Sequence, residues 1–215
     1  MPDVWDKLHD LVAPPPEDVY DPQEHRYRRN GVLVPGATDV LRMAGITDYG
    51  DIPKWILERA GAIGTAVHKA TEMIDRGESL DPDSIDEAVA GHLLSYNRWL
   101  DTVPEIMFSE IEKWGVVELG RLPYGMIRDR VAEFNDSIWV LDIKTSSKKA
   151  DWWPLQLAAY SNRMTRRAVV WTKKDGSPAK FIEYTDEGDY DVWEAALRVA
   201  HWRIRNGAKI REDRG

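Results

Sequence analysis

The feature that most constrains this chain is the apolar segment Ser137-Ile138-Trp139-Val140-Leu141, which runs directly into charged residues. Its β-branched and aromatic residues are typical of a buried strand. On such a strand Asp142 and Lys144 point to one face of the sheet, while Ile143 points to the other. Burying a carboxylate and an ammonium is costly unless they pair with each other or hold a ligand. The segment therefore predicts either a functional site or a structural ion pair.

Length and composition set the broad class of the protein. A chain of 215 residues with 43% hydrophobic and 10% aromatic residues can bury one good core and is not disordered. We expect most of its ten tryptophans in that core. The absence of cysteine excludes a disulfide, a zinc–thiolate site and an iron–sulfur cluster. No apolar run is long enough to span a membrane and the N-terminus does not resemble a secretory signal, so we expect a cytoplasmic protein without membrane partners.

The formal net charge of −8 weighs against nucleic-acid binding, because phosphate binders usually present a basic surface. The basic residues are nevertheless clustered, whereas acidic residues concentrate at 72–87 and 183–194. A local basic groove on an acidic body is therefore compatible with the sequence. The basic clusters are Arg26, Arg28 and Arg29; Lys148 and Lys149; Arg163, Arg166 and Arg167; Lys173 and Lys174; and Arg198, Arg203, Arg205, Lys209 and Arg211.

The hydrophobic pattern predicts an N-terminal extension over residues 1–30 and a single domain over residues 31–215. Thr38 is a candidate N-cap for a short helix, and Asp151 for a later helix that runs to about Met164. The remaining expected helices cover residues 53–76, 84–101 and 187–206. Expected strands cover residues 32–34, 106–112, 116–118, 123–134, 138–143, 168–171 and 181–184. This order predicts an α/β (α+β) fold with a mixed sheet of about five strands flanked by helices.

Asp129, Asp142 and Lys144 supply the parts of a metal-dependent phosphodiesterase site. Mg²⁺ prefers oxygen ligands, usually one or two carboxylates with waters and substrate phosphate. The metal generates hydroxide near neutral pH and neutralises charge that builds on the phosphate. A nearby lysine orients or deprotonates the attacking water. Two adjacent strands would bring these three residues together.

The ordered motifs resemble those of the PD-(D/E)xK nuclease superfamily, and within it the RecB-like exonuclease group with its phage-type single-domain enzymes. The resemblance covers residues 31–205. It implies a restriction-endonuclease-like core. Its motifs are Gly64-Thr65-Ala66-Val67-His68 with Glu72, then Glu110, Gly125 to Asp129, Asp142-Ile143-Lys144-Thr145, and Gln156-Leu157-Ala158-Ala159-Tyr160.

The resemblance also implies a role for each matched residue. His68, Asp129, Asp142 and the backbone carbonyl of Ile143 would bind Mg²⁺ or Mn²⁺, and Lys144 would be the catalytic lysine. Glu110 would be an accessory acid or second-metal ligand. Gln156 and Tyr160, which share a helix face, would support the site or contact DNA.

This sequence departs from the family pattern at one position. The family commonly spaces its glycine and first aspartate as G-x-x-D, whereas one extra residue separates Gly125 from Asp129. We expect a bulge at Arg128 to absorb it. The proline of the superfamily's name is absent, as it is in many members.

Structural interpretations remain open for several of these residues. His68 and Glu72 lie away from the apolar stripe of their helix and so could form a solvated pair. Asp129 could be an ordinary turn acid. Glu110 alternates with Glu112, so the ligand could be either or neither. Further alternatives are helix packing for Gln156 and Tyr160, and core packing rather than base stacking for Trp152 and Trp153.

The leading functional hypothesis is a Mg²⁺- or Mn²⁺-dependent DNA exonuclease of phage or bacterial recombination, repair or replication, working in a bacterial or phage-infected cell. Its partner would be DNA, with a recombinase, annealing protein or helicase as further candidates, and a homo-oligomer is possible. One alternative is a non-catalytic DNA-end-binding or interaction module that keeps the nuclease fold. Another is a subunit of a larger helicase–nuclease or annealing assembly.

Overall fold

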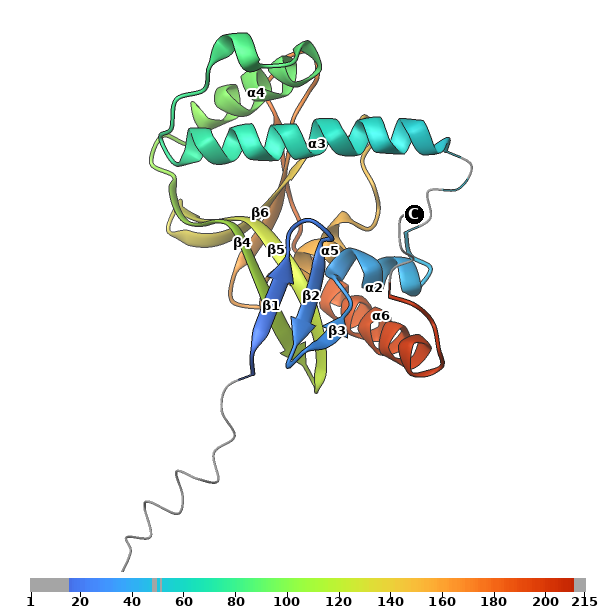
Figure 1. The fold of residues 1–215 in the computed structure, drawn as a ribbon. Helices are drawn as coiled ribbons and strands as arrows, with labels where there is room; N and C mark the ends of the chain where they lie inside the picture. The colour runs from blue at the N-terminus through green and yellow to red at the C-terminus, as the bar shows by residue number, and fades with distance from the viewer. Residues whose placement is uncertain (1–15, 48–49, 51, 211–215) are drawn as a thin grey trace, which may run out of the picture.

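The computed structural model describes residues 16–47, 50 and 52–210 (Figure 1). Its larger sheet has five strands in the order β4-β5-β6-β7-β8. The parallel pair β6–β7 is joined through helix α5 (Trp153–Tyr160), and the other neighbours are antiparallel. The expected mixed sheet of about five strands is confirmed, consistent with a restriction-endonuclease-like core. The strands are β4 (Met107–Leu119), β5 (Leu122–Phe134), β6 (Ser137–Lys144), β7 (Arg166–Trp171) and β8 (Lys180–Glu183).

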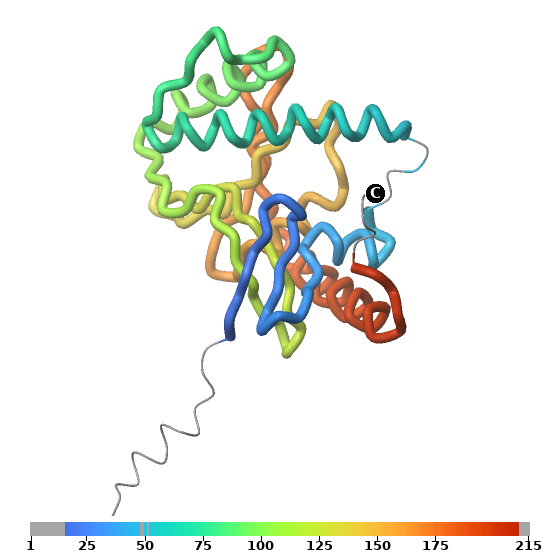
Figure 2. The backbone as a smooth tube through the Cα atoms, viewed as in Figure 1, coloured from blue at the N-terminus to red at the C-terminus, as the bar shows by residue number. Residues whose placement is uncertain are grey.

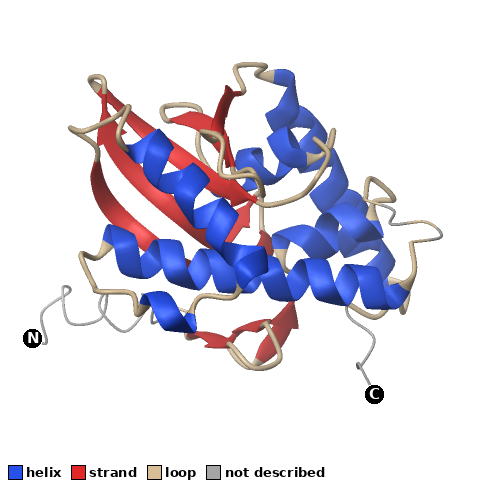
Figure 3. Cartoon of the chain, turned by 90° about the horizontal axis from the view of Figure 1, so that it is seen from above, coloured by secondary structure: helices blue, strands red, loops and turns tan. Residues whose placement is uncertain are grey.

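Helices cover both faces of this sheet (Figures 1 and 3). Helices α3 (Lys54–Asp75) and α4 (Glu87–Leu100) share one apolar core with Ile143 and its neighbours on the sheet, and the short helix η1 (Pro82–Ser84) precedes α4. Helices α2 (Ala37–Met43), α5 and α6 (Gly188–Arg205) share the other core. Ile63, Val67, Ala70 and Ile74 all belong to the α3–α4 core, so the apolar stripe expected on residues 53–76 is confirmed.

A second, three-stranded sheet lies against β4 and β5, and the backbone trace shows it beside them (Figure 2). It consists of β1 (Asp18–Asp21), β2 (Arg26–Arg29) and β3 (Val32–Val34). The ring of Tyr27 is 2% exposed and lies on the backbone of Gly125, where an added Cβ would come within 2.0 Å of the ring. These strands include residues 18–29 of the expected N-terminal extension, whose residues 1–15 lie outside the described part.

Both expected helix caps are wrong. Helix α2 begins at Ala37 with Gly36 as its N-cap. The Gly36 N–H donates to the side chain of Asp39, and Thr38 lies inside the helix. Helix α5 begins at Trp153, with Trp152 rather than Asp151 as its N-cap, and ends at Tyr160, four residues earlier than expected. It ends there because Asn162 accepts from the N–H of Met164 and closes a turn in its place.

Most of the tryptophans among the described residues lie in a core, as expected, and Trp152 and Trp171 are half-buried against the α2–α5–α6 core. Trp99, Trp139, Trp153 and Trp193 are at most 4% exposed. Trp55, Trp114 and Trp202 instead expose 64%, 39% and 58% of their surface, so these three do not belong to a core.

The strand irregularity lies in β4 rather than in β5. Residues expected as two strands form one long β4, and its pairing with β5 shifts register between Phe108 and Glu110, which leaves Ser109 as the extra residue. The register runs unbroken through Arg128, opposite Lys113. The expected bulge at Arg128 is therefore wrong.

No helix in the described ranges combines the length and apolar character needed to traverse a lipid bilayer.

Candidate metal centre

The candidate centre lies where β5 and β6 separate. Their ladder ends with the pair Arg130 and Leu141. Beyond that pair, the Ile143 N–H donates instead to Oδ2 of Asp129 at 2.7 Å. Asp129 and Asp142 are buried, with 6% and 2% exposed. Asp129 is therefore held by the backbone of β6 and is not an ordinary turn acid.

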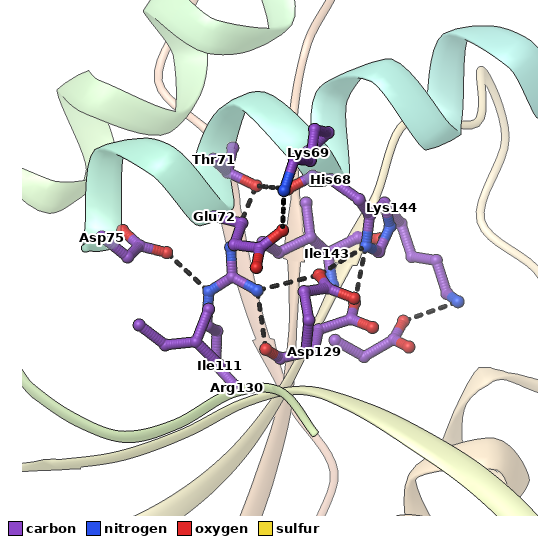
Figure 4. Close-up of polar contacts among 12 residues, drawn as sticks. His68, Lys69, Thr71, Glu72, Asp75, Ile111, Asp129, Arg130, Ile143 and Lys144 are labelled. Carbon is purple, nitrogen blue, oxygen red and sulfur yellow. Dashed lines mark hydrogen bonds and ion pairs between the residues drawn. The ribbon is translucent and has the colours of Figure 1, made fainter. Parts of the chain in front are cut away.

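His68 reaches this point from α3 (Figure 4). Its Nε2 lies 3.0 Å from the carbonyl oxygen of Ile143, and its Nδ1 lies 3.2 Å from Glu112 and 3.5 Å from Asp129. Glu72 instead pairs along α3 with Lys69 and Arg76. The solvated His68–Glu72 pair is therefore wrong, because the imidazole points to the sheet.

The acid that joins His68 and Asp129 is Glu112, not Glu110. One ligand atom from each of His68, Glu112 and Asp129 lies within 4.8 Å of the other two. Glu110 pairs with Arg128 at 2.6 Å. The strict alternation of side chains along β4 fails here because Glu112 has a φ of +48°, far from strand geometry. Glu110 therefore lies outside the group, as a consequence of backbone irregularity rather than residue type.

Lys144 connects the acids to α5. Its Nζ lies 2.6 Å from Asp142 Oδ2 and donates to Gln156 Oε1 at 2.7 Å. The Gln156 amide in turn donates to the Tyr160 hydroxyl at 2.7 Å. The expected Gln156–Tyr160 pair thus faces the site. The Asp142–Lys144 ion pair also exists, but β6 is the middle strand of the sheet and not its edge.

Arg130 also belongs to this region, although it is not part of any of the sequence motifs. It is fully buried and donates to Asp75 at 2.5 Å, to Glu112 at 2.9 Å and to Thr71 at 3.1 Å. Tyr96 also donates to Asp75, at 2.8 Å. Arg130 thereby fixes Glu112 and ties β5 to α3. Its place in the sequence could have indicated this role, because an arginine within an apolar strand directly follows the candidate ligand Asp129.

The charges in the centre oppose one another. Burial raises the pKa of Asp142 to about 6 and also raises the pKa of Asp129, while Lys144 and His68 act against these increases. Burial would lower the pKa of His68, but Asp129 and Glu112 outweigh it and raise that pKa to about 9. At neutral pH the imidazole is therefore protonated, and its positive charge lies among the carboxylates.

The donor set fits a hard divalent cation. It offers carboxylates from Glu112, Asp129 and Asp142, the carbonyl of Ile143 and one imidazole, a mainly oxygen set. The buried Oδ2 of Asp142 has the Lys144 ion pair but no hydrogen bond of normal geometry within the described residues. A carboxylate oxygen with unused capacity is what a cation would engage.

A cavity of about 510 Å³ opens over the centre. His68, Asp129 and Asp142 line it from the sheet and α3. Tyr20 and His25 line it from the small N-terminal sheet. The centre therefore lines a cavity whose walls come from two parts of the fold.

Comparisons with known proteins give no closer identification. No family profile matches the sequence, and no curated protein matches it. A solved structure from Eubacterium rectale, provisionally assigned as an exonuclease, aligns with a TM-score of 0.49 and 11% identity over 85% of this chain and 91% of that one. The protein SSO0001 aligns with a TM-score of 0.30 and 19% identity over 53% and 56%. The geometry of the site is therefore the main guide to function.

Proposed function

We propose that this chain is a divalent-metal-dependent deoxyribonuclease of the RecB-like group of the PD-(D/E)xK superfamily, acting as an exonuclease on DNA ends. One observation carries the proposal. His68 from α3, Glu112 from β4 and Asp129 from β5 converge beside the Asp142–Lys144 pair of β6. A structural ion pair requires only two of these groups.

The chain's own residues would divide the work among them. His68, Glu112, Asp129, Asp142 and the Ile143 carbonyl would hold Mg²⁺ or Mn²⁺, which supplies a hydroxide near neutral pH and offsets phosphate charge when bound. Lys144, held between Asp142 and Gln156, would place its ammonium against the attacking water or the phosphate. Tyr160 keeps the Gln156 amide oriented toward Lys144. Glu110 pairs with Arg128 outside this group, so it would act as an accessory acid and not as a ligand of the same cation.

The test is a cleavage assay on end-labelled single- and double-stranded DNA with Mg²⁺ or Mn²⁺. We expect mononucleotides or short products from the wild type, with losses of at least a hundredfold in Asp142→Asn and Lys144→Met. A matched control is Asp83→Asn, which changes an exposed acid of η1 and should retain full activity. Equal cleavage by all four proteins would mean that the activity comes from elsewhere.

The same assay separates the alternative function. DNA binding that persists under chelation, without cleavage under any metal or strandedness, would identify a non-catalytic DNA-end-binding module. A rate that rises only when a helicase, recombinase or annealing protein is added would identify a subunit of a larger assembly in phage or bacterial recombination, repair or replication. Size-exclusion chromatography with light scattering tests whether the protein forms a homo-oligomer.

A further inference from the structure

The loop that follows β7 is held firmly against α4. The side chain of His92 pairs with Thr172 at 2.8 Å, and Thr172 donates to the carbonyl of Lys144 at 3.0 Å. Ser95 Oγ accepts from the N–H of Lys173 at 2.8 Å, and Arg98 donates to the carbonyl of Gly176. His92, Thr172 and Ser95 are all buried. Helix α4 thus fixes this loop in relation to the end of the catalytic strand.

Gly91 shows how closely the helix and the loop approach each other. A Cβ at this position would lie 1.8 Å from the carbonyl oxygen of Lys174. Such an approach is possible only without a side chain. The loop that carries Lys173 and Lys174 is therefore packed directly against the backbone of α4.

This loop forms one wall of a cavity of about 780 Å³ that adjoins the candidate metal centre. His68 and Lys144 line both this cavity and the one over the centre. Trp152 and Lys173 line this second cavity but not the one over the centre. The two cavities therefore meet where Lys144 lies.

The cavity combines positive charge with aromatic surface. The rings of Trp152 and Trp153 line it, and Lys144 lies 5.4 Å from the centre of the Trp152 ring. Outside this lining, the Lys173 ammonium lies 3.0 Å from the centre of the Trp171 ring. Burial and the nearby charge of Lys180 lower the pKa of Lys173. A bound anion would relieve the repulsion between the Lys173 and Lys180 ammonium groups. Lys174 is exposed.

One acid also lines the cavity, and its charge is engaged locally. The carboxylate of Asp175 accepts hydrogen bonds from the N–H and the hydroxyl of Ser177 within its own turn. Positive charge therefore predominates along this wall. A basic groove with aromatic side chains is the usual surface for single-stranded nucleic acid, because phosphates meet the cations and bases stack on the rings.

We propose that this groove, lined by Trp152, Lys173 and Lys174, binds single-stranded DNA beside the phosphate that Lys144 meets. The proposal rests on the proposed nuclease function. Lys173 and Lys174 contact backbone phosphates, and the half-buried ring of Trp152 stacks on a base. The α4 residues act as positioning residues, because they hold the loop without touching the strand.

The test measures binding of fluorescein-labelled oligothymidylate by anisotropy, in EDTA and over a series of salt concentrations. The variant is Lys173→Gln/Lys174→Gln. Its matched control is Arg198→Gln/Arg203→Gln, which removes the same charge from exposed positions on α6, on the other face of the sheet.

We expect the lysine variant to bind at least tenfold more weakly. The slope of log affinity against log salt should become shallower by about 1.4, at roughly 0.7 for each phosphate of a single strand that the variant no longer neutralises. Trp152→Leu should weaken binding roughly five- to a hundredfold with the slope unchanged, because stacking carries no salt dependence of this kind. The control should stay within about twofold of the wild type, and circular dichroism verifies that each variant is folded.

Any of three results would overturn the proposal that this groove binds single-stranded DNA. They are an unchanged affinity and slope in the lysine variant, an equal loss of affinity in the arginine control, or duplex DNA bound as tightly as the single strand. Cleavage assays on the same proteins separate this inference from the proposed function. If the wild type cleaves DNA and the lysine variant binds normally, only the groove is refuted. If the lysine variant loses binding but no metal supports cleavage by the wild type, only the nuclease function is refuted.

Discussion

The raised pKa of His68 predicts that metal binding releases a proton. An imidazole must be neutral to bind a metal, yet Asp129 and Glu112 raise the pKa of His68 to about 9. At pH 7 the metal must therefore displace a proton at a cost of about 3 kcal/mol, or roughly a hundredfold in apparent affinity. The penalty shrinks as the pH approaches 9. Apparent affinity should rise about tenfold for each pH unit up to that point.

Asp142 adds a second step at lower pH. Burial raises its pKa to about 6, so below that pH the carboxylate also carries a proton that a cation must displace. The expected release is about one proton between pH 6 and 9 and about two below pH 6. Affinity should accordingly fall more steeply with decreasing pH once the pH drops below 6.

Isothermal titration calorimetry with Mn²⁺ under nitrogen measures both quantities between pH 5.5 and 8.5. Repeating each titration in buffers of different ionisation enthalpy gives the number of protons released. His68→Gln provides the control, because it keeps a polar side chain but cannot be protonated there. Its affinity should lose the pH dependence between 7 and 8.5. A wild type with no pH dependence in that range, or a variant that retains it, would refute the assignment of the proton to His68.

Three further changes test other parts of the structure. Glu112→Gln should lower Mn²⁺ affinity roughly 10- to 100-fold in calorimetry. Glu110 lies outside the group, so Glu110→Gln should change the affinity less than about threefold. A larger loss in Glu110→Gln than in Glu112→Gln would restore Glu110 as the ligand. Arg130→Met should destabilise the fold by about 3–5 kcal/mol in urea unfolding, because the buried Asp75 carboxylate loses its ion-pair partner and keeps only the hydrogen bond from Tyr96. Adding Asp75→Leu should recover much of that loss, and a single variant as stable as the wild type would contradict the reasoning. Gly91→Ala should lower the melting temperature and weaken oligothymidylate binding, since its Cβ meets the facing loop; unchanged values for both would show that the loop yields freely.

The local parts of the site could be predicted from the sequence. Alternation along a strand placed Asp142 and Lys144 on one face, and helical spacing placed Gln156 beside Tyr160. The order of motifs predicted that His68 would join them. Each of these expectations depends on residues near in sequence or on a resemblance that already encodes the fold.

The remaining parts depend on irregularities and distant contacts. The choice of Glu112 over Glu110 follows from the positive φ at Glu112, which alternation cannot anticipate. The buried pair of Arg130 with Asp75 joins residues 55 positions apart, and neither residue reveals its partner. Strands β1 and β2 have only four residues each, too few to show a clear period.

The contact of the Tyr27 ring with Gly125 joins the small N-terminal sheet to β5, the strand that carries Asp129. Gly125 and Asp129 belong to the same strand, so the aromatic wall of the cavity and a carboxylate of the metal centre share one piece of backbone. A side chain at position 125 would displace the tyrosine ring and move the wall. Whatever occupies the cavity against Tyr27 therefore bears on the same strand that carries the Asp129 carboxylate, four positions from Gly125.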